Sequence, residues 1–397
     1  MLKRSISILM LLVMLSAAAC TGSETAKRAY DAPVSFSGQA HDVDVFFVNV
    51  GKADCAVVLI DGHAWLVDAG TEESFLNTYS VLELLKVKAL DGVILSHGHG
   101  DHVGGLDPIL KKYAVGKVFF PALQNDNSKI NAVLIESGLK SEPMRAGGRI
   151  DVTDGVYFDV LGPVSLNTDN DNDNSLVLKL NVNGRSFLFT GDMQFDEETS
   201  LISAGAELLC DVLKVQNHGN PDAVSEAFAD AADPLIAVIS TDTSVDADSA
   251  NRLVAAKLRD AEVCLTEDTV LGIWLSVSAE GVISVSKPDR PNASVTGLSF
   301  TDVSKETQSF TLKNDSGVDA DLSGMCCWST KGYEVFVFPE GTVLKSGESL
   351  TVACKISPLA QTADFVWNIK KVWADSKEDS AVLSDAYGNT VARAESR

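Results

Sequence analysis

Three of the protein's six histidines fall within one short run of the sequence. The run reads Ser-His-Gly-His-Gly-Asp-His over residues 96–102 and follows an apolar stretch at 92–95. Imidazole nitrogens and a carboxylate crowded together and spaced by glycines suit divalent metal ions. On an extended loop His97 and His99 point the same way and can hold one ion, while Asp101 and His102 can reach a second. A polar surface loop without metal is the alternative, and this density of ligands disfavours it.

The elements around this run alternate between short apolar strands and helices. Strands are predicted by the apolar runs that turn residues separate, at 45–50, 56–60, 64–67, 92–95, 176–180, 186–190, 212–215, 235–239 and 270–277. Helices are predicted at 71–88, with Thr71 as N-cap, from about residue 197, and at 247–259. A strand meander followed by alternating strands and helices favours helices packed outside two central sheets.

Several further motifs occur in a fixed order around the histidine run. They are Val-Asn-Val-Gly-Lys-Ala-Asp at 48–54, Leu-Val-Asp-Ala-Gly at 66–70, Asn-Ser-Leu-Val-Leu at 174–178, Phe-Thr-Gly-Asp at 189–192 and Asp-Val-Leu-Lys-Val-Gln-Asn-His-Gly-Asn at 211–220. Together with His-x-His-x-Asp-His they resemble the metallo-β-lactamase superfamily, and within it the extracellular hydrolase domain of the ComEC competence proteins. The resemblance implies an α+β, four-layer αββα fold over residues 41–287.

The resemblance also implies that the domain binds two divalent metal ions. Zinc is the expected metal, and manganese is the alternative. By position, the implied ligands are His97 and His99 for the first ion, Asp101, His102 and His218 for the second, and Asp192 as the bridge between them. Asp101 is the implied catalytic residue, because it can also accept a proton from the nucleophile. Asp68 is expected to orient the ligand loop rather than to bind metal.

Two positions depart from the family pattern. No histidine lies between His102 and His218, so a ligand that many relatives use at the first ion is missing. Asn174 or water is expected to fill that place. Asn217 stands where one of two paired histidines is usual, which leaves open whether His218 is the true ligand. The acidic run at 169–173 is interpreted as a solvated hairpin loop rather than a calcium site.

The N-terminus has the pattern of an export signal. Lys3 and Arg4 precede an apolar stretch at 6–15 and small residues at 16–19. Residues 1–19 are therefore predicted to be a signal peptide and residues 20–40 a tether. Cys20 resembles a bacterial lipidation site, with Ala17 where leucine is usual, and secretion after Ala19 is the alternative. No other stretch predicts a membrane span, so the protein is expected outside the cytoplasm, lipid-anchored or secreted.

The C-terminal part has a different pattern. A Pro- and Asp-containing linker at 287–292 precedes short strands and turns over residues 293–397. Motifs at 315–324, 338–347 and 385–389 resemble the lamin-tail domain, an immunoglobulin-like all-β sandwich, although Trp328 stands two residues beyond its usual place. Such a domain implies an accessory binding role, and a stabilising spacer is the alternative. Buried free thiols are expected, with Cys326 or Cys327 and Cys354 as the conceivable pair.

The net charge of −23 argues against tight, non-specific binding of DNA by the whole surface. It does not exclude a nuclease whose metal ions supply positive charge locally. We therefore expect an exported phosphodiesterase that acts on DNA or nucleotides. The alternatives are a hydrolase of cell-envelope phosphodiesters, such as phosphorylcholine or teichoic-acid linkages, and a non-catalytic surface binding protein with a degenerate metal site.

Overall fold

The computed structural model describes residues 28–293, 295–374 and 378–397. The predicted signal peptide and Cys20 lie outside the described residues. In the described ranges, no helix has both the length and the apolar character that crossing a membrane requires.

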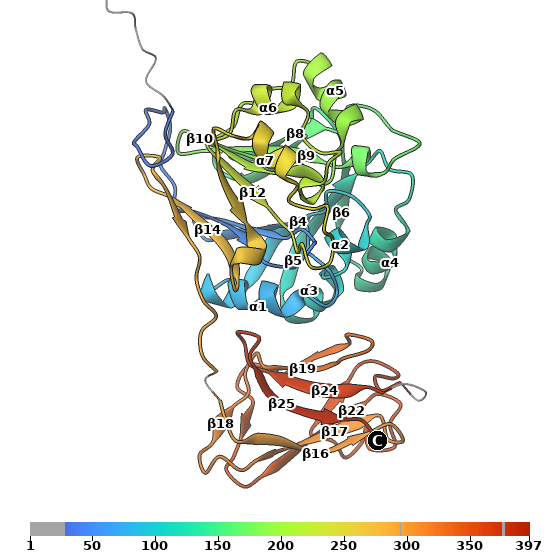
Figure 1. The fold of residues 1–397 in the computed structure, drawn as a ribbon. Helices are drawn as coiled ribbons and strands as arrows, with labels where there is room; N and C mark the ends of the chain where they lie inside the picture. Colours follow the sequence, from blue (N-terminus) through green and yellow to red (C-terminus); the bar gives the residue numbers. More distant parts are fainter. Residues whose placement is uncertain (1–27, 294, 375–377) are drawn as a thin grey trace, which may run out of the picture.

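A mixed sheet of eight strands in the described chain forms one half of the larger domain (Figure 1). In spatial order the strands are β15 (Ile283–Ser286), β14 (Gly272–Val277), β1 (Val43–Val48), β2 (Ala56–Ile60), β3 (His63–Val67), β4 (Ala89–Ile94), β5 (Ala114–Pro121) and β6 (Ser141–Met144). Pairing is antiparallel from β15 to β3 and parallel from β3 to β6. Side chains alternate along a strand, so Val45 and Phe47 enter one core while Phe46 and Val48 enter another.

A second mixed sheet, with seven strands among the described residues, packs against the first through the core that contains Val45 and Phe47. Its strands in spatial order are β13 (Glu262–Leu265), β12 (Ile236–Ile239), β11 (Val212–Lys214), β10 (Arg185–Phe189), β9 (Val177–Val182), β8 (Val156–Gly162) and β7 (Arg149–Thr153). Strands β10 to β13 are parallel and β7 to β10 antiparallel. The hairpin between β9 and β10 turns at Asn183 and Gly184, which both have positive φ.

Helices cover the outer faces of both sheets (Figure 1). The first sheet is covered by α1 (Phe75–Leu84), α3 (Leu106–Lys112) and α4 (Ser128–Ser137), and the second by α5 (Phe195–Ser203), α6 (Glu226–Ala232) and α7 (Arg252–Lys257). A short helix, α2 (Gly100–Val103), and the 3-10 turns η1 (Asn172–Asn174), η2 (Gln216–Gly219) and η3 (Thr266–Asp268) lie in the connections. The layers therefore follow the predicted order of helices, sheet, sheet and helices.

Two predicted helices are shorter in the structure. The first begins at Phe75 rather than Thr71, because the Thr71 hydroxyl accepts the Ser74 amide at 3.2 Å in a turn before the helix. The helix predicted at 247–259 is reduced to α7, which Asn251 caps by accepting the Leu253 amide at 3.0 Å. Side-chain capping therefore sets the start of α7, whereas α1 follows the Thr71 turn and its N-cap residue, Ser74, makes no side-chain cap.

The C-terminal region consists of strands and turns in the ranges 295–374 and 378–397, which confirms the all-β prediction. Its sheets are β16 (Leu298–Ser304), β17 (Ser309–Asn314), β22 (Ser349–Cys354) and β23 (Phe365–Trp367); β18 (Ala320–Asp321) and β21 (Val343–Leu344); and β20 (Val335–Val337), β19 (Cys326–Ser329), β24 (Ser380–Ser384) and β25 (Thr390–Glu395). Phe310 and Trp373 are fully buried in its core. The six cysteines in the described residues are buried and free.

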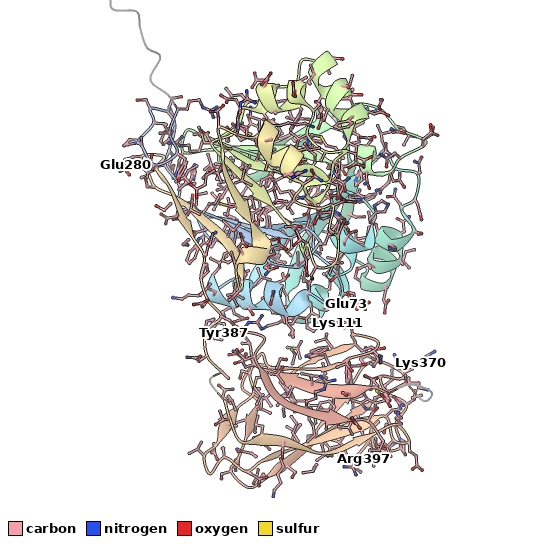
Figure 2. The ribbon with its side chains drawn as sticks, viewed as in Figure 1. Glu73, Lys111, Glu280, Lys370, Tyr387 and Arg397 are labelled. Atoms are coloured by element: carbon pink, nitrogen blue, oxygen red, sulfur yellow. The ribbon has the colours of Figure 1, made fainter. Side chains whose placement is uncertain are left out.

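The C-terminal region packs directly against α1 and α3 of the larger domain. The Trp328 ring meets the Phe75 ring edge-on, with 5.7 Å between the ring centroids. Arg290, in the linker, donates to the Gly388 carbonyl at 2.7 Å and also contacts Asn77 on α1. Figure 2 shows Tyr387 at this boundary. Apolar packing and buried polar contacts, in addition to the linker, therefore join the two regions.

Candidate metal centre

The predicted site residues follow the carboxyl ends of two pairs of parallel strands, one pair from each sheet. Asp68 follows β3 and the histidine run follows β4, which pairs with β3. Asp192 follows β10 and His218 follows β11, which pairs with β10. Parallel neighbours end at the same edge of a sheet, so side chains far apart in the sequence meet there.

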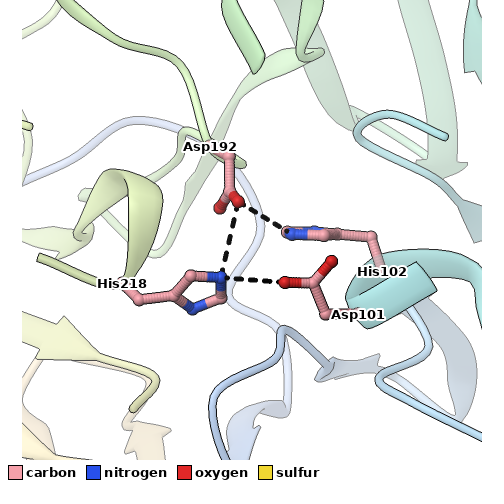
Figure 3. Close-up of side chains that lie close together, drawn as sticks. All are labelled: Asp101, His102, Asp192 and His218. Atoms are coloured by element: carbon pink, nitrogen blue, oxygen red, sulfur yellow. Dashed lines mark ion pairs between the residues drawn. The ribbon is translucent and has the colours of Figure 1, made fainter. Parts of the chain in front are cut away.

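Four of the predicted metal ligands point toward one another (Figure 3). Asp192 Oδ2 lies 3.2 Å from His102 Nε2 and 3.4 Å from His218 Nε2. Asp101 Oδ2 lies 3.4 Å from His218 Nε2. Each of the four side chains offers one ligand atom, and these atoms all lie within 4.8 Å of one another. The structure thus brings together the set that was predicted for the second ion and the bridge.

Unpartnered polar atoms show that this cluster fits a cation. Among the described residues, His102 Nε2, His218 Nε2 and Asp192 Oδ1 are buried without a hydrogen-bond partner. Both Nε2 atoms lie at ion-pair distance from Asp192 Oδ2, but burial without a hydrogen bond costs free energy, which a bound divalent ion would offset. Two imidazoles and two carboxylates form the donor set that zinc and manganese accept.

The other imidazole nitrogen of each histidine is held by a second residue. His102 Nδ1 lies 3.0 Å from Asp68 Oδ2, and Asp68 Oδ1 accepts the Ser96 amide at 2.6 Å. His218 Nδ1 lies 2.9 Å from the Ser240 carbonyl. These contacts turn both Nε2 atoms into the cluster. Asp68 therefore lies where the expected orienting role requires.

Comparison with known proteins is consistent with this geometry. Residues 48–243 match the family model described as the metallo-beta-lactamase superfamily. The chain carries a metallo-β-lactamase superfamily domain. The two mixed sheets and their outer helices form the fold of this domain, which confirms the α+β prediction.

Curated relatives of the metallo-β-lactamase domain include competence proteins. ComE operon protein 3 of Bacillus subtilis is 30% identical over 157 residues, which cover 39% of this chain and 20% of that protein. Competence protein ComA of Neisseria gonorrhoeae is 32% identical over 156 residues, with the same coverage of 39% and 20%. The chain thus spans about a fifth of the length of these relatives. Among solved structures, YhfI of Bacillus subtilis aligns with a TM-score of 0.42 and 13% identity, covering 59% of this chain and 99% of that chain.

Protonation equilibria in the metal-free centre follow from its carboxylates. Burial opposes protonation of His102, but the charges of Asp192 and Asp68 outweigh it and raise the His102 pKa well above its usual value. Burial likewise opposes protonation of His218, and Asp192 and Asp101 raise its pKa to about 9. The same histidines outweigh burial at Asp192 and hold its pKa well below the usual range. Without metal, protons on the imidazoles therefore balance the buried carboxylates.

His97 and His99, the predicted ligands of the first ion, pair with each other. His97 Nε2 lies 2.9 Å from His99 Nδ1, and the rings of His97 and His102 are 4.1 Å apart between centroids. Burial and the nearby charge of His102 lower the His97 pKa well below its usual value. In the described chain, no third imidazole, carboxylate or thiol forms a compact ligand group with this pair.

Of the two groups expected to complete the first site, Asn174 or water, Asn174 is held within its own loop. Its amide is used within its own loop, where Oδ1 accepts the Asn167 amide at 2.8 Å and Nδ2 donates to the Asn167 carbonyl at 2.9 Å. The neighbouring Ser175 hydroxyl instead lies 3.4 Å from His97 Nδ1 and accepts the Asp192 amide at 3.1 Å. The solvated-loop interpretation of 169–173 is wrong for Asp173, which is buried and accepts the Gln194 amide at 2.7 Å.

The ambiguity between Asn217 and His218 has a geometric answer. Asn217 directs its side chain away from the four ligands and donates to Asp222 at 2.8 Å. Its φ of 43° lies in the left-handed region, which asparagine tolerates. His218, not its neighbour, therefore reaches the cluster.

Two charged residues of the site were missed by sequence reasoning. Lys214 forms an ion pair with Asp54, and both side chains are 5% exposed. Asp54 Oδ2 lies 3.8 Å from His102 Nδ1, and Asp54 Oδ1 lies 3.7 Å from His218 Nδ1. Asp54 belongs to the motif at 48–54 and Lys214 to the motif at 211–220. The motifs therefore mark both residues, but they do not show that the two side chains pair with each other. Lys214 and Asp54 therefore form a buried ion pair directly behind the two ligand histidines.

Proposed function

We propose that the metallo-β-lactamase domain is a metal-dependent phosphodiesterase that acts on DNA or nucleotides. The observation that carries the proposal is the cluster of Asp101, His102, Asp192 and His218, whose ligand atoms all lie within 4.8 Å of one another. The Asp101 side chain is 26% exposed, whereas the other three are at most 4% exposed. The cluster is therefore reachable from solvent on the Asp101 side.

Each residue of the cluster has a defined part in this proposal. His102, His218 and Asp192 bind cation, and Asp68 and the Ser240 carbonyl fix the imidazole rings. Two bound divalent ions would supply an activated water near neutral pH and neutralise charge that develops on the phosphoryl oxygens. Asp101, at the open side, also accepts the proton that the attacking water loses. Residues 41–287 are proposed as the hydrolase domain, with His97 and His99 holding the more open first ion.

The proposed substrate class rests on the curated relatives and on charge. The competence proteins among the relatives support DNA as the first candidate. The net charge of −23 disfavours long polyanions and so favours a small phosphodiester, such as a phosphorylcholine linkage, within the second, cell-envelope class; a teichoic-acid linkage stays in that class without support from charge.

Location and the C-terminal region belong to the same proposal. We place the enzyme outside the cytoplasm, secreted or anchored through Cys20, with zinc as the resident metal and manganese as the alternative. Residues 293–397 are proposed as a lamin-tail-like, immunoglobulin-like accessory domain. The two four-stranded sheets within the described residues of this region support that assignment.

The test is the metal content of the purified protein together with hydrolysis of bis-p-nitrophenyl phosphate. We expect two ions per chain and turnover that is lost on chelation and restored by zinc or manganese. Linear DNA and a phosphorylcholine ester, compared at two salt concentrations, then separate the two substrate classes. A folded, metal-loaded protein without turnover in either metal would overturn the proposal and favour a surface binding protein.

A further inference from the structure

Lys52 lies at the open side of the metal centre. Its Nζ atom is 3.7 Å from Asp101 Oδ2 and 4.0 Å from Asp246 Oδ2, and its side chain is 24% exposed. Asp101 is the one partly exposed member of the four-residue cluster. A substrate that approaches the ligands from solvent therefore meets the ammonium group of Lys52.

The two lysines of the site have different surroundings. Lys214 is buried and forms a close ion pair with Asp54, so its charge is already balanced. Lys52 stands beyond hydrogen-bond distance from both of its carboxylate neighbours. A cation bound at Asp101 would also compete with Lys52 for that carboxylate. The Lys52 ammonium thus keeps its donors for a ligand, whereas the Lys214 ammonium does not.

The turn that carries Lys52 is held in place on both sides. Asn49 Nδ2 donates to the Thr269 carbonyl at 2.8 Å, and the Asn49 carbonyl accepts Asn77 Nδ2 at 2.5 Å. Gly51 has a φ of 76°, and its carbonyl accepts the Ala53 amide at 2.9 Å. A lysine on such a pinned turn loses less conformational freedom on binding than one on a free loop.

A second lysine lies over the same ligand loop. The Nζ atom of Lys129, on α4, lies so close to Gly100 that a Cβ atom on this glycine would meet it at 3.1 Å. Gly100 directly precedes Asp101, and Lys129 is exposed. In a chain with a net charge of −23, Lys52 beside Asp101 and Lys129 beside Gly100 place two ammonium groups along the ligand loop.

We propose that Lys52, assisted by Lys129, binds a negatively charged oxygen of the substrate's phosphoryl group and so selects anionic phosphate esters over neutral esters. The inference rests on the proposed phosphodiesterase function and names the group that recognises its substrate. An ammonium group is a strong point-charge donor to phosphate oxygen. Lys52 is therefore a specificity-determining residue at the entrance, distinct from the metal ligands.

The experiment compares Lys52→Ala, Lys52→Arg and Lys129→Ala with Lys88→Ala, which removes the same charge from an exposed lysine just before the first residue of β4. Binding of inorganic phosphate to the zinc-loaded protein is measured by calorimetry, alongside kcat/KM for bis-p-nitrophenyl phosphate. We expect Lys52→Ala to weaken both by about ten- to hundredfold, the loss of one charged hydrogen bond. Lys129→Ala should have a smaller effect, and Lys52→Arg should retain most of the binding.

Metal content and thermal stability of each variant are measured to separate recognition from folding. Unchanged zinc content with weakened phosphate binding in Lys52→Ala supports the proposal. Phosphate binding that Lys52→Ala and Lys88→Ala leave equally unchanged overturns it, as does wild-type protein that binds no phosphate. If the wild type binds phosphate through Lys52 but cleaves no diester, the recognition site stands and the phosphodiesterase function fails.

Discussion

The two ends of the histidine run have opposite electrostatic surroundings. At one end His102 joins His218 between buried carboxylates, and the pKa values of both histidines are raised. At the other end His97 pairs with the exposed His99, and the His97 pKa is lowered. The difference lies in Asp192 and Asp68. Both carboxylates form ion pairs with His102, and neither forms one with His97 or His99. One sequence motif thus supplies two ligand groups whose affinity for protons, and hence for cations, is set by residues elsewhere in the chain.

Removing the Asp192 carboxylate should have the largest effect on turnover and on the difference in metal binding between the two ends of the histidine run. Asp192→Ala is expected to lower turnover of bis-p-nitrophenyl phosphate by about a thousandfold or more, because it removes the ligand shared by His102 and His218. The matched variant His99→Ala should lose one of two ions and keep the other. Elemental analysis and steady-state kinetics on both proteins check this. Equal metal loss in the two variants would show that the two ends are not distinct.

A change of pH should have the next largest effect, and it should act on zinc affinity. Metal binds neutral imidazole, and the His218 pKa is about 9 in the metal-free fold. Zinc affinity should therefore rise with pH up to about 9, by about tenfold per unit for each proton displaced. Calorimetry in buffers of different ionisation enthalpy measures the protons released.

The stability of the metal-free fold should fall as the pH rises, whereas zinc affinity should increase. The raised His218 pKa means that its proton stabilises the fold fully below about pH 6.5, the usual pKa of a free histidine. That contribution is lost as the pH rises through about 9. Denaturant unfolding at several pH values, with and without zinc, measures this contribution to stability.

In the calorimetric experiment, zinc binding at pH 7 without any release of protons would contradict the assigned protonation states.

Replacing Asn217 by the histidine that is usual at this position in the family should have the smallest effect on zinc binding. Asn217→His is expected to change the zinc dissociation constant by less than about threefold, because position 217 points to Asp222 while His218 already reaches the cluster. Histidine also tolerates the left-handed backbone at this position. A competition titration with a chelator of known affinity measures the change. A third bound ion, or affinity raised by a hundredfold, would mean that Asn217 marks a weakened ligand position.

Sequence patterns identified the parts of the site that depend on spacing along the chain. The strand before His97 and the strands on either side of Asn183 follow from local apolar patterns, and the structure contains them as β4, β9 and β10. The patterns could not show which partner satisfies a buried group. Asn174 is taken up by its own loop and Lys214 balances Asp54, and both outcomes depend on contacts between distant segments. The strands and helices between residues 103 and 165 were also not anticipated.

The contact between Trp328 and Phe75, with Arg290 beside it, has a geometric consequence for the whole molecule. A region joined by a free linker samples a sphere whose radius grows with linker length. A region docked on α1 and α3 samples one position instead. Under the accessory binding role proposed above, a surface held by the C-terminal strands would lie at one distance and angle from Lys52 and the His-Asp cluster, and binding at one end would set the effective concentration of substrate at the other.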